Sequence, residues 1–154
     1  YIMKICRLTI QEIDDYQSDI ADMLRQSFEK SFPNHRYDSM IFYDRIEKLK
    51  TYMRADKAIV IGIKEDNHLL GFIWFFEKVI PGGNVIHINH FVVHDKYRAL
   101  GLGRALIEEV EQHAKRQGVS QIELFVTKDN VDAVRFYEKR DFKIERFVMT
   151  KRLW

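Results

Sequence analysis

Residues 92–104 read VVHDKYRALGLGR, an apolar strand end followed by a basic loop with two glycines and then by the start of an amphipathic helix. The first amides of a helix have no acceptor within the helix, and the helix dipole adds partial positive charge at the same end. Glycine lets an anion approach the backbone closely, and Arg98 and Arg104 add two full charges. The stretch therefore predicts a phosphate-binding loop between a strand and a helix.

The segments on either side of this loop predict a sheet with helices on both faces. The expected elements upstream are a strand at 3–9, helices from Thr9 to about Phe32 and from Asp38 or Ser39 to Met53, and antiparallel strands at 58–64, 69–79 and 85–94. The expected elements downstream are a helix at 104–117, a strand at 122–126, a helix at 130–140 and one or two closing strands at 142–153. We therefore expect one α/β (α+β) domain over residues 1–154, with a mixed central sheet of about six or seven strands.

Composition narrows the class of protein. The 154 residues carry 25 Lys and Arg against 23 Asp and Glu, a net charge of +2 without a basic patch, so nucleic acid is not an expected partner. A single cysteine, Cys6, excludes an internal disulfide and a Cys-rich zinc site, and no His spacing suggests a metal. No apolar run is long enough to span a membrane, and we expect a cytoplasmic protein. Met3 is compatible with a natural start, which leaves open whether Tyr1 and Ile2 are native.

Two other glycine-loop classes fit poorly. A dinucleotide fold needs a small residue at the third glycine position, where Leu106 stands, and a parallel βαβ unit where antiparallel hairpins are expected. A Walker loop needs Gly-Lys-Ser or Gly-Lys-Thr, which does not follow. A nucleotide-binding domain is therefore the weaker interpretation.

Two motifs in the chain resemble those of the GNAT superfamily of acetyl-CoA-dependent N-acetyltransferases. RALGLG at 98–103 matches the family's Arg/Gln-x-x-Gly-x-Gly/Ala pyrophosphate loop, preceded by Val93 and Tyr97 at the family spacing. NVDAVRFYEKRDF at 130–142 is similar to the family's Asn-x-x-Ala-x-x-Phe-Tyr-Glu-Lys-x-Gly-Phe motif, with Asp141 where glycine is usual. The motifs and the strand before them cover residues 85–142, in the family's order.

The resemblance implies a site for acetyl-CoA. In the family, the fourth strand splays from the fifth, and the pantetheine arm of coenzyme A lies in the gap against the backbone of the fourth strand. The pyrophosphate is held by the loop amides, and a tyrosine on the last helix points at the sulfur. The residues that would bind acetyl-CoA here are Phe91, Val92, Val93, Arg98, Ala99, Leu100, Gly101, Leu102, Gly103, Arg104, Asn130 and Tyr137.

The reaction implied is direct attack of a neutral amine on the thioester carbonyl, with Tyr137 as hydrogen-bond donor or proton donor to the leaving thiolate. Many family members carry a glutamate base on the fourth strand, but residues 85–94 contain no acid, and Asn89 falls where that glutamate often lies. If no bulge intervenes, strand alternation places His87, Asn89, Phe91 and Val93 on one face. His87 is the preferred base, because histidine titrates near neutral pH, while Glu123 and bulk water remain open.

The resemblance therefore implies a transferase, more narrowly an acyltransferase that acetylates a primary amine. A small-molecule acceptor is favoured, because Phe125 lies where N-terminal acetyltransferases often carry a polar residue. A protein N-terminus or lysine as acceptor, and a non-catalytic acyl-CoA-binding module, are the alternatives. Membranes are not expected partners, and the C-terminal segment ending in Leu153 and Trp154 is compatible with a homodimer.

Overall fold

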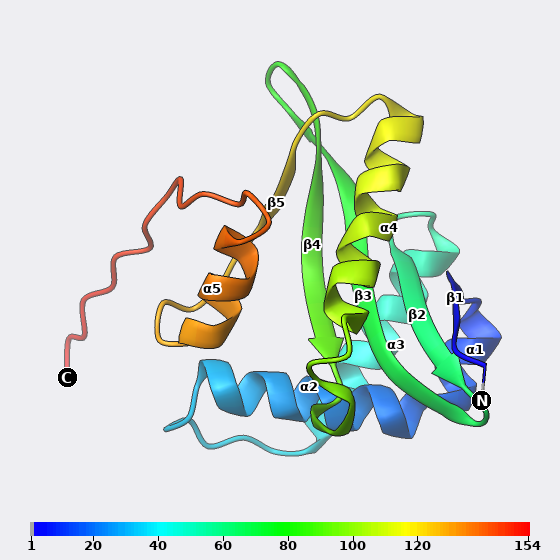
Figure 1. Ribbon diagram of the computed structural model, residues 1–154. Helices are drawn as coiled ribbons and strands as arrows, with labels where there is room; N and C mark the ends of the chain where they lie inside the picture. The colour runs from blue at the N-terminus through cyan, green and yellow to red at the C-terminus, as the bar shows by residue number, and fades with distance from the viewer. Residues whose placement is uncertain (1) are drawn as a thin grey trace.

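The computed structural model describes residues 2–154, in which one sheet is flanked by helices (Figure 1). The elements are β1 (Lys4–Arg7), α1 (Ile10–Asp15), α2 (Gln17–Ser31), α3 (Met40–Arg54), β2 (Ile59–Glu65), β3 (His68–Ile80), β4 (Gly83–Val93), a 3-10 turn (Asp95–Tyr97), α4 (Leu102–Gln117), β5 (Ile122–Leu124) and α5 (Val131–Glu138). None of the helices in the described part of the chain has the length and hydropathy needed to cross a lipid bilayer.

The sheet is mixed and has the order β1-β2-β3-β4-β5. The first four strands pair antiparallel, and β5 pairs parallel to β4. Because α4 links β4 to β5, the crossover places this helix on one face of the sheet. The expected strand meander and the strand-helix-strand unit after it are both present.

Each face of the sheet has its own apolar core. One core joins the face that carries Phe72, Trp74 and Val92 to α1, α2 and α3. The other joins the opposite face to α4 and includes Leu106, Ile107 and Val110, with side chains of α5 packed at its margin. The α4 stripe follows the predicted helical spacing, and the sheet alternates between the two cores as a strand period of two requires.

Helix ends follow from local chemistry. Thr9 and Glu12 form the predicted capping box at the start of α1, with each side chain accepting from the backbone N–H of the other. The expected first helix is divided at Tyr16 into α1 and α2, a break that no proline or glycine signals. Gly118 ends α4 with a φ of 68°, the left-handed conformation in which glycine is unstrained.

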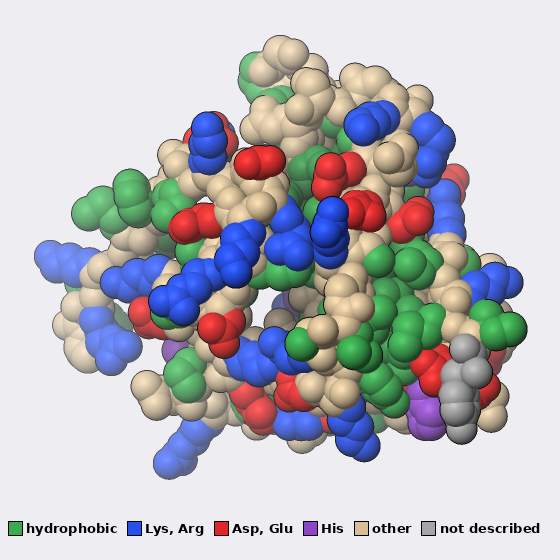
Figure 2. Space-filling model, in the orientation of Figure 1, with side chains coloured by type: hydrophobic (Ala, Val, Ile, Leu, Met, Phe, Trp, Pro, Cys, Tyr) green, Lys and Arg blue, Asp and Glu red, His purple; other side chains and the backbone are tan. Residues whose placement is uncertain are grey.

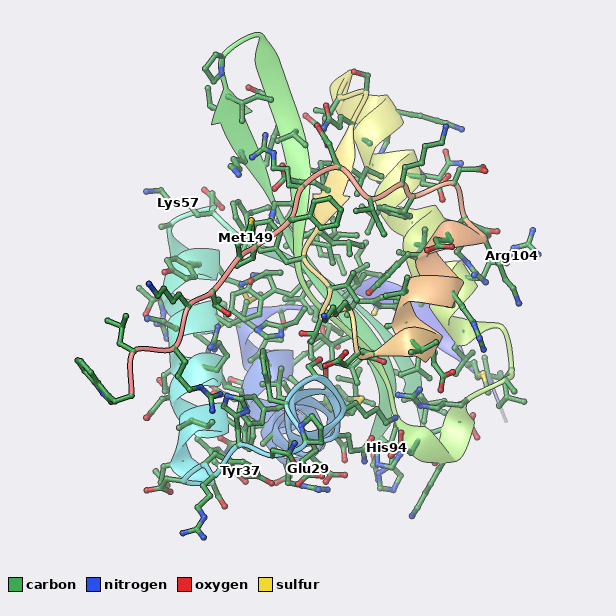
Figure 3. All side chains as sticks on the ribbon, turned by 90° about the vertical axis from the view of Figure 1, so that its left-hand side faces the viewer. Glu29, Tyr37, Lys57, His94, Arg104 and Met149 are labelled. Carbon is green, nitrogen blue, oxygen red and sulfur yellow. The ribbon has the colours of Figure 1, made fainter. Side chains whose placement is uncertain are left out.

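The predicted strand count is wrong: the described residues form five strands instead of six or seven. No strand forms in the segment 142–153, and the chain from Lys143 onward is exposed. Figure 3 shows this tail, labelled at Met149, as an extended chain. Alternation of apolar and polar residues indicates strand propensity, but a strand also needs a neighbouring edge with which to pair. The pattern of the tail carries no information about that edge.

A left-handed residue connects α5 to Phe142. Asp141 has a φ of 67°, its N–H donates to the carbonyl of Glu138, and the N–H of Phe142 donates to the carbonyl of Tyr137. These two bonds form a Schellman motif, which places Phe142 against the Tyr137 ring at a centroid distance of 5.5 Å. The position that is glycine in the family motif is therefore a left-handed cap here.

We expect Asp141→Gly to stabilise the protein by about 1 kcal/mol, because glycine removes the steric cost of an L side chain in the left-handed conformation. The matched control is Lys139→Gly. Lys139 has a right-handed φ of −64°, so glycine there brings only its entropy cost and should destabilise. Denaturant unfolding measures both variants. An Asp141→Gly protein no more stable than the parent would mean that the strain is relieved elsewhere.

Candidate functional site

β4 and β5 pair over only part of the length of β4 and then separate. They pair only from Ile86 with Ile122 to Ile88 with Leu124. From His90 to Val93, β4 remains paired with β3, while its other edge has no strand partner among residues 2–154. Backbone groups on that edge can therefore pair with an extended ligand, as the predicted splay between the fourth and fifth strands requires.

A bulge lies where the strands separate. Trp74 pairs with His90, whereas Phe75 pairs with Ile88, which leaves Asn89 as the extra residue. Ile88 and Phe91 consequently face the same core, the one covered by α4. The predicted common face for His87, Asn89, Phe91 and Val93 is therefore wrong: His87 lies on the opposite face from Phe91 and Val93, because the bulge inverts the alternation at Asn89.

The predicted phosphate loop lies between β4 and α4. Ala99 and Gly101 both have left-handed φ values, 63° and 76°, and turn the chain into the helix. Gly101 is the N-cap, no side chain caps α4, and the first backbone bond of the helix runs from the N–H of Ala105 to the carbonyl of Gly101. The amides of residues 102–104 therefore have neither an acceptor within the helix nor a side-chain cap, which is the arrangement that the predicted anion site needs.

Gly103 has a second role, in packing. A Cβ atom at this position would lie 3.1 Å from Phe136 and 3.3 Å from Phe91. The absence of a side chain thus lets α4 approach α5 and the end of β4. Leu102 is buried in the same core, whereas Leu100 and Arg104 are exposed. Arg104 pairs with Glu108 one turn on, at 2.9 Å from Nε to Oε1.

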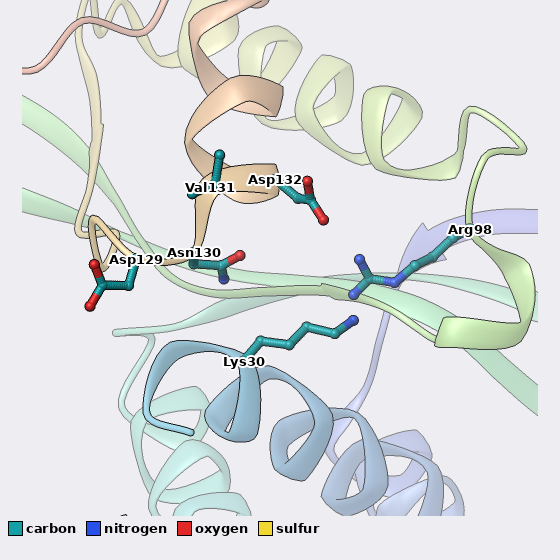
Figure 4. Close-up of a pocket in the computed structure, with 6 residues that line it drawn as sticks. All are labelled: Lys30, Arg98, Asp129, Asn130, Val131 and Asp132. Atoms are coloured by element: carbon teal, nitrogen blue, oxygen red, sulfur yellow. The ribbon is translucent and has the colours of Figure 1, made fainter. Parts of the chain in front are cut away.

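A cavity of about 260 Å³ lies beside this loop. Its lining residues come from α2, the loop and the start of α5: Lys30, Arg98, Asp129, Asn130, Val131 and Asp132 (Figure 4). In the space-filling view an opening between α5 and β4 is rimmed by basic and acidic side chains (Figure 2). The structure therefore brings together Arg98 and Asn130, which the sequence assigned to the same ligand. Lys30 belongs to neither motif, and no sequence signal pointed to it.

Asn130 caps α5 with its side chain. Its Oδ1 accepts from the N–H of Ala133 at 3.4 Å, so the side-chain amide group remains available to the cavity. The predicted N-cap is confirmed. The cap accounts for asparagine at this position independently of any ligand.

Tyr137 lies two turns further along α5, on the side of β4. Its ring packs against Phe91, Phe136 and Phe142, with the Phe91 and Tyr137 ring centroids 6.1 Å apart. Burial raises the pKa of Tyr137 to about 12. The phenol therefore stays protonated at neutral and moderately alkaline pH, next to the unpaired end of β4.

His87 and Glu123 face each other across the last paired stretch of β4 and β5. His87 Nδ1 lies 2.5 Å from Glu123 Oε2, and Lys78 Nζ lies 3.4 Å from the same oxygen. Burial raises the pKa of Glu123, but the hydrogen bonds from His87 and Lys78 outweigh this and lower it below its ordinary value. Glu123 is thus an ionised acceptor that orients the imidazole. The rings of Phe76 and Phe125 pack against His87, at centroid distances of 5.3 and 4.8 Å.

A second histidine on the same face lies next to the bulge. His90 packs on Trp74 with ring centroids 5.2 Å apart, and its Nε2 is buried without a hydrogen-bond partner. Burial, with a smaller contribution from Arg45, lowers the pKa of His90 to about 4. An imidazole with so low a pKa is a poor proton acceptor at neutral pH. Of these two histidines, His87 is the better candidate base.

Known proteins resemble the chain both in sequence and in fold. The uncharacterized protein YxbD of Bacillus subtilis is 32% identical over 85 residues, which are 54% of this chain and 49% of YxbD, so the chain spans about half of that relative's length. Glucosamine 6-phosphate N-acetyltransferase 1 of Dictyostelium discoideum is 27% identical over 135 residues, 86% of this chain and 81% of the relative. A predicted acetyltransferase from Clostridium acetobutylicum, solved with acetyl-CoA, superposes with a TM-score of 0.79 at 13% identity, covering 99% of this chain and 97% of its own.

The family model described as acetyltransferase (GNAT) family matches residues 18–142. This match contains both motifs, the unpaired end of β4 and all the residues of the predicted acetyl-CoA site. The chain belongs to the acetyltransferase (GNAT) family.

Proposed function

We propose that the protein is an acetyl-CoA-dependent N-acetyltransferase that acetylates a primary amine in a ternary complex. The observation that carries this function is the unpaired edge of β4 from Asn89 to Val93, with free helix amides at one end and Tyr137 beside it. An extended chain with amide groups and a terminal diphosphate fits such an edge. The arm can pair with the strand backbone, while the diphosphate meets the start of α4.

Each candidate residue has a separate task in this reaction. Acetyl-CoA supplies a thioester, and the amine attacks the carbonyl carbon of this thioester while the thiolate leaves. Tyr137 donates a hydrogen bond to the sulfur and stabilises the charge that develops there. Because its pKa of about 12 lies well above that of a typical thiol, about 8.5, stabilisation by the hydrogen bond matters more than complete proton transfer.

The proton released by the amine needs an acceptor. We propose His87 for this task, with Glu123 as the residue that orients the ring through Nδ1 and leaves Nε2 as the accepting atom. This dyad takes the place of the glutamate that many relatives carry on the fourth strand. Bulk water is the alternative acceptor.

A small-molecule amine is the proposed acceptor. Phe125, 81% exposed at the end of β5, offers an apolar surface next to His87, and the Dictyostelium relative is named for an amino sugar phosphate.

The acidic side chains of α1 and α2 give less support to a cationic acceptor than their number suggests. Asp14 pairs with Lys50, Asp19 accepts from the N–H of Leu69, and Asp22 pairs with Arg25.

Calorimetric titration with acetyl-CoA, with NAD and ATP as controls, tests this function. We expect a dissociation constant on the order of micromolar for acetyl-CoA alone. Turnover is then measured against polyamines, amino sugars with and without phosphate, and peptides with a free N-terminus or lysine. Binding without turnover of any amine would favour a non-catalytic acyl-CoA-binding module, and absence of binding would contradict the function altogether.

A further inference from the structure

Two cations from different parts of the chain converge on the cavity beside the phosphate loop. Lys30, near the end of α2, and Arg98, in the loop, both reach into it (Figure 4). Lys30 Nζ lies 2.6 Å and Arg98 Nε 2.9 Å from the same oxygen, Oδ1 of Asp95. An ammonium carries three N–H donors and a guanidinium five, so most of the donors on both side chains are not used by Asp95.

Lys30 is held at this place by the contacts of α2 with the loop. One turn before it, Gln26 Oε1 accepts from the N–H of Asp95 at 3.2 Å. One turn earlier again, Asp22 Oδ2 lies 3.0 Å from His94 Nε2. These contacts, four residues apart, fix the side of α2 that faces the loop. The backbone of Lys30 is therefore placed so that its side chain leaves α2 on the side of the cavity before any ligand binds.

The charge around the cavity is mixed. Asp95, Asp129 and Asp132 are its acidic groups, and in Figure 4 the Asp129 carboxylate points away from the two cations. Asp132 lies in the first turn of α5, where the helix dipole offsets part of its charge. Asp95 is thus the carboxylate that the two cations share. An anionic ligand with several oxygens can use the donors that Asp95 leaves free.

We propose that Lys30 and Arg98 together form a phosphate-binding subsite for coenzyme A, with Asp95 as the carboxylate that the two cations share before the ligand binds. This subsite rests on the proposed function, and it adds a residue of α2 to a site otherwise built from the loop and α5. It also brings α2 into contact with the nucleotide end of the ligand.

Calorimetry with coenzyme A and with 3′-dephospho-coenzyme A tests the subsite in the wild-type protein and in two variants. Lys30→Gln removes the charge, and we expect about tenfold weaker binding of coenzyme A at low salt, because a charge-assisted hydrogen bond is lost. This difference should shrink as salt is added. Asp95→Asn breaks the same ion pair but keeps the cation, so it should bind coenzyme A at least as tightly as wild type.

The two variants distinguish a contact with the ligand from a purely structural role of the Lys30–Asp95 ion pair. If the Lys30–Asp95 ion pair serves only to hold α2 against the loop, both variants lose this ion pair and both should bind coenzyme A equally weakly. That result would overturn the subsite. Unchanged affinity in Lys30→Gln would overturn it as well. An equal loss for both ligands assigns the contact to the diphosphate, and a loss confined to coenzyme A assigns it to the 3′-phosphate; either supports the subsite. Failure of the wild-type protein to bind would instead contradict the proposed function. Thermal unfolding is the check that both variants are folded.

Discussion

Replacement of Tyr137 by phenylalanine is expected to lower kcat about 100-fold, a loss of about 2.7 kcal/mol of transition-state stabilisation. Acetyl-CoA affinity should stay within about twofold, because the removed hydroxyl acts on charge that develops only as the thiolate leaves. The ring itself remains packed between Phe91 and Phe142, so the fold of α5 should not change. Steady-state kinetics at saturating amine, together with calorimetry, separates the two effects.

The pH dependence offers a second check on Tyr137. Its raised pKa of about 12 keeps the hydroxyl protonated, so its deprotonation should not reduce kcat between about pH 8 and about pH 10. Tyr52→Phe, a surface substitution on α3, serves as the control and should leave kcat unchanged. A Tyr137→Phe enzyme whose kcat stays within about twofold of wild type would rule out the leaving-group role.

The parts of the site that follow from local chemistry could be read from the sequence. A strand, a basic glycine loop and a helix start are consecutive at 92–104, so their order already indicates an anion site. Asn130 and Tyr137 lie seven residues apart, which places them on one side of α5 once the helix is recognised. These inferences require only the helical period and the chemistry of helix ends.

The parts that depend on pairing or on distant contacts could not be read in the same way. The bulge at Asn89 changes which residues share a face of β4, and nothing in the apolar pattern marks it. Lys30 reaches the cavity because α2 packs along the loop at 94–98. Its partner in that loop, Asp95, lies 65 residues later in the sequence. The pairing of His87 with Glu123 depends on the parallel register between β4 and β5. Each of these features is set by tertiary structure.

Substitution of His87 by asparagine is expected to lower kcat/KM for the amine about 30-fold near neutral pH, an effect within the usual range for a general base. The defect should shrink as the pH rises, because a free primary amine with a pKa of about 10 is increasingly deprotonated in solution and no longer needs a base on the enzyme. Glu123→Gln keeps the size of the side chain but removes its charge. It should therefore produce a smaller defect with the same dependence on pH.

The matched control is His113→Asn. His113 is half-buried and its ring packs on Phe75, as the ring of the buried His87 packs on Phe76, but His113 lies on α4 away from β5. It should leave the pH profile of kcat/KM unchanged. A His87→Asn defect of equal size at every pH would indicate a structural role for the ring, and no defect at all would leave bulk water as the proton acceptor. The decisive quantity is therefore the ratio of mutant to wild-type kcat/KM as a function of pH. Because proton removal from the amine is the only step that rising pH performs without the enzyme, recovery at high pH assigns His87 to that step.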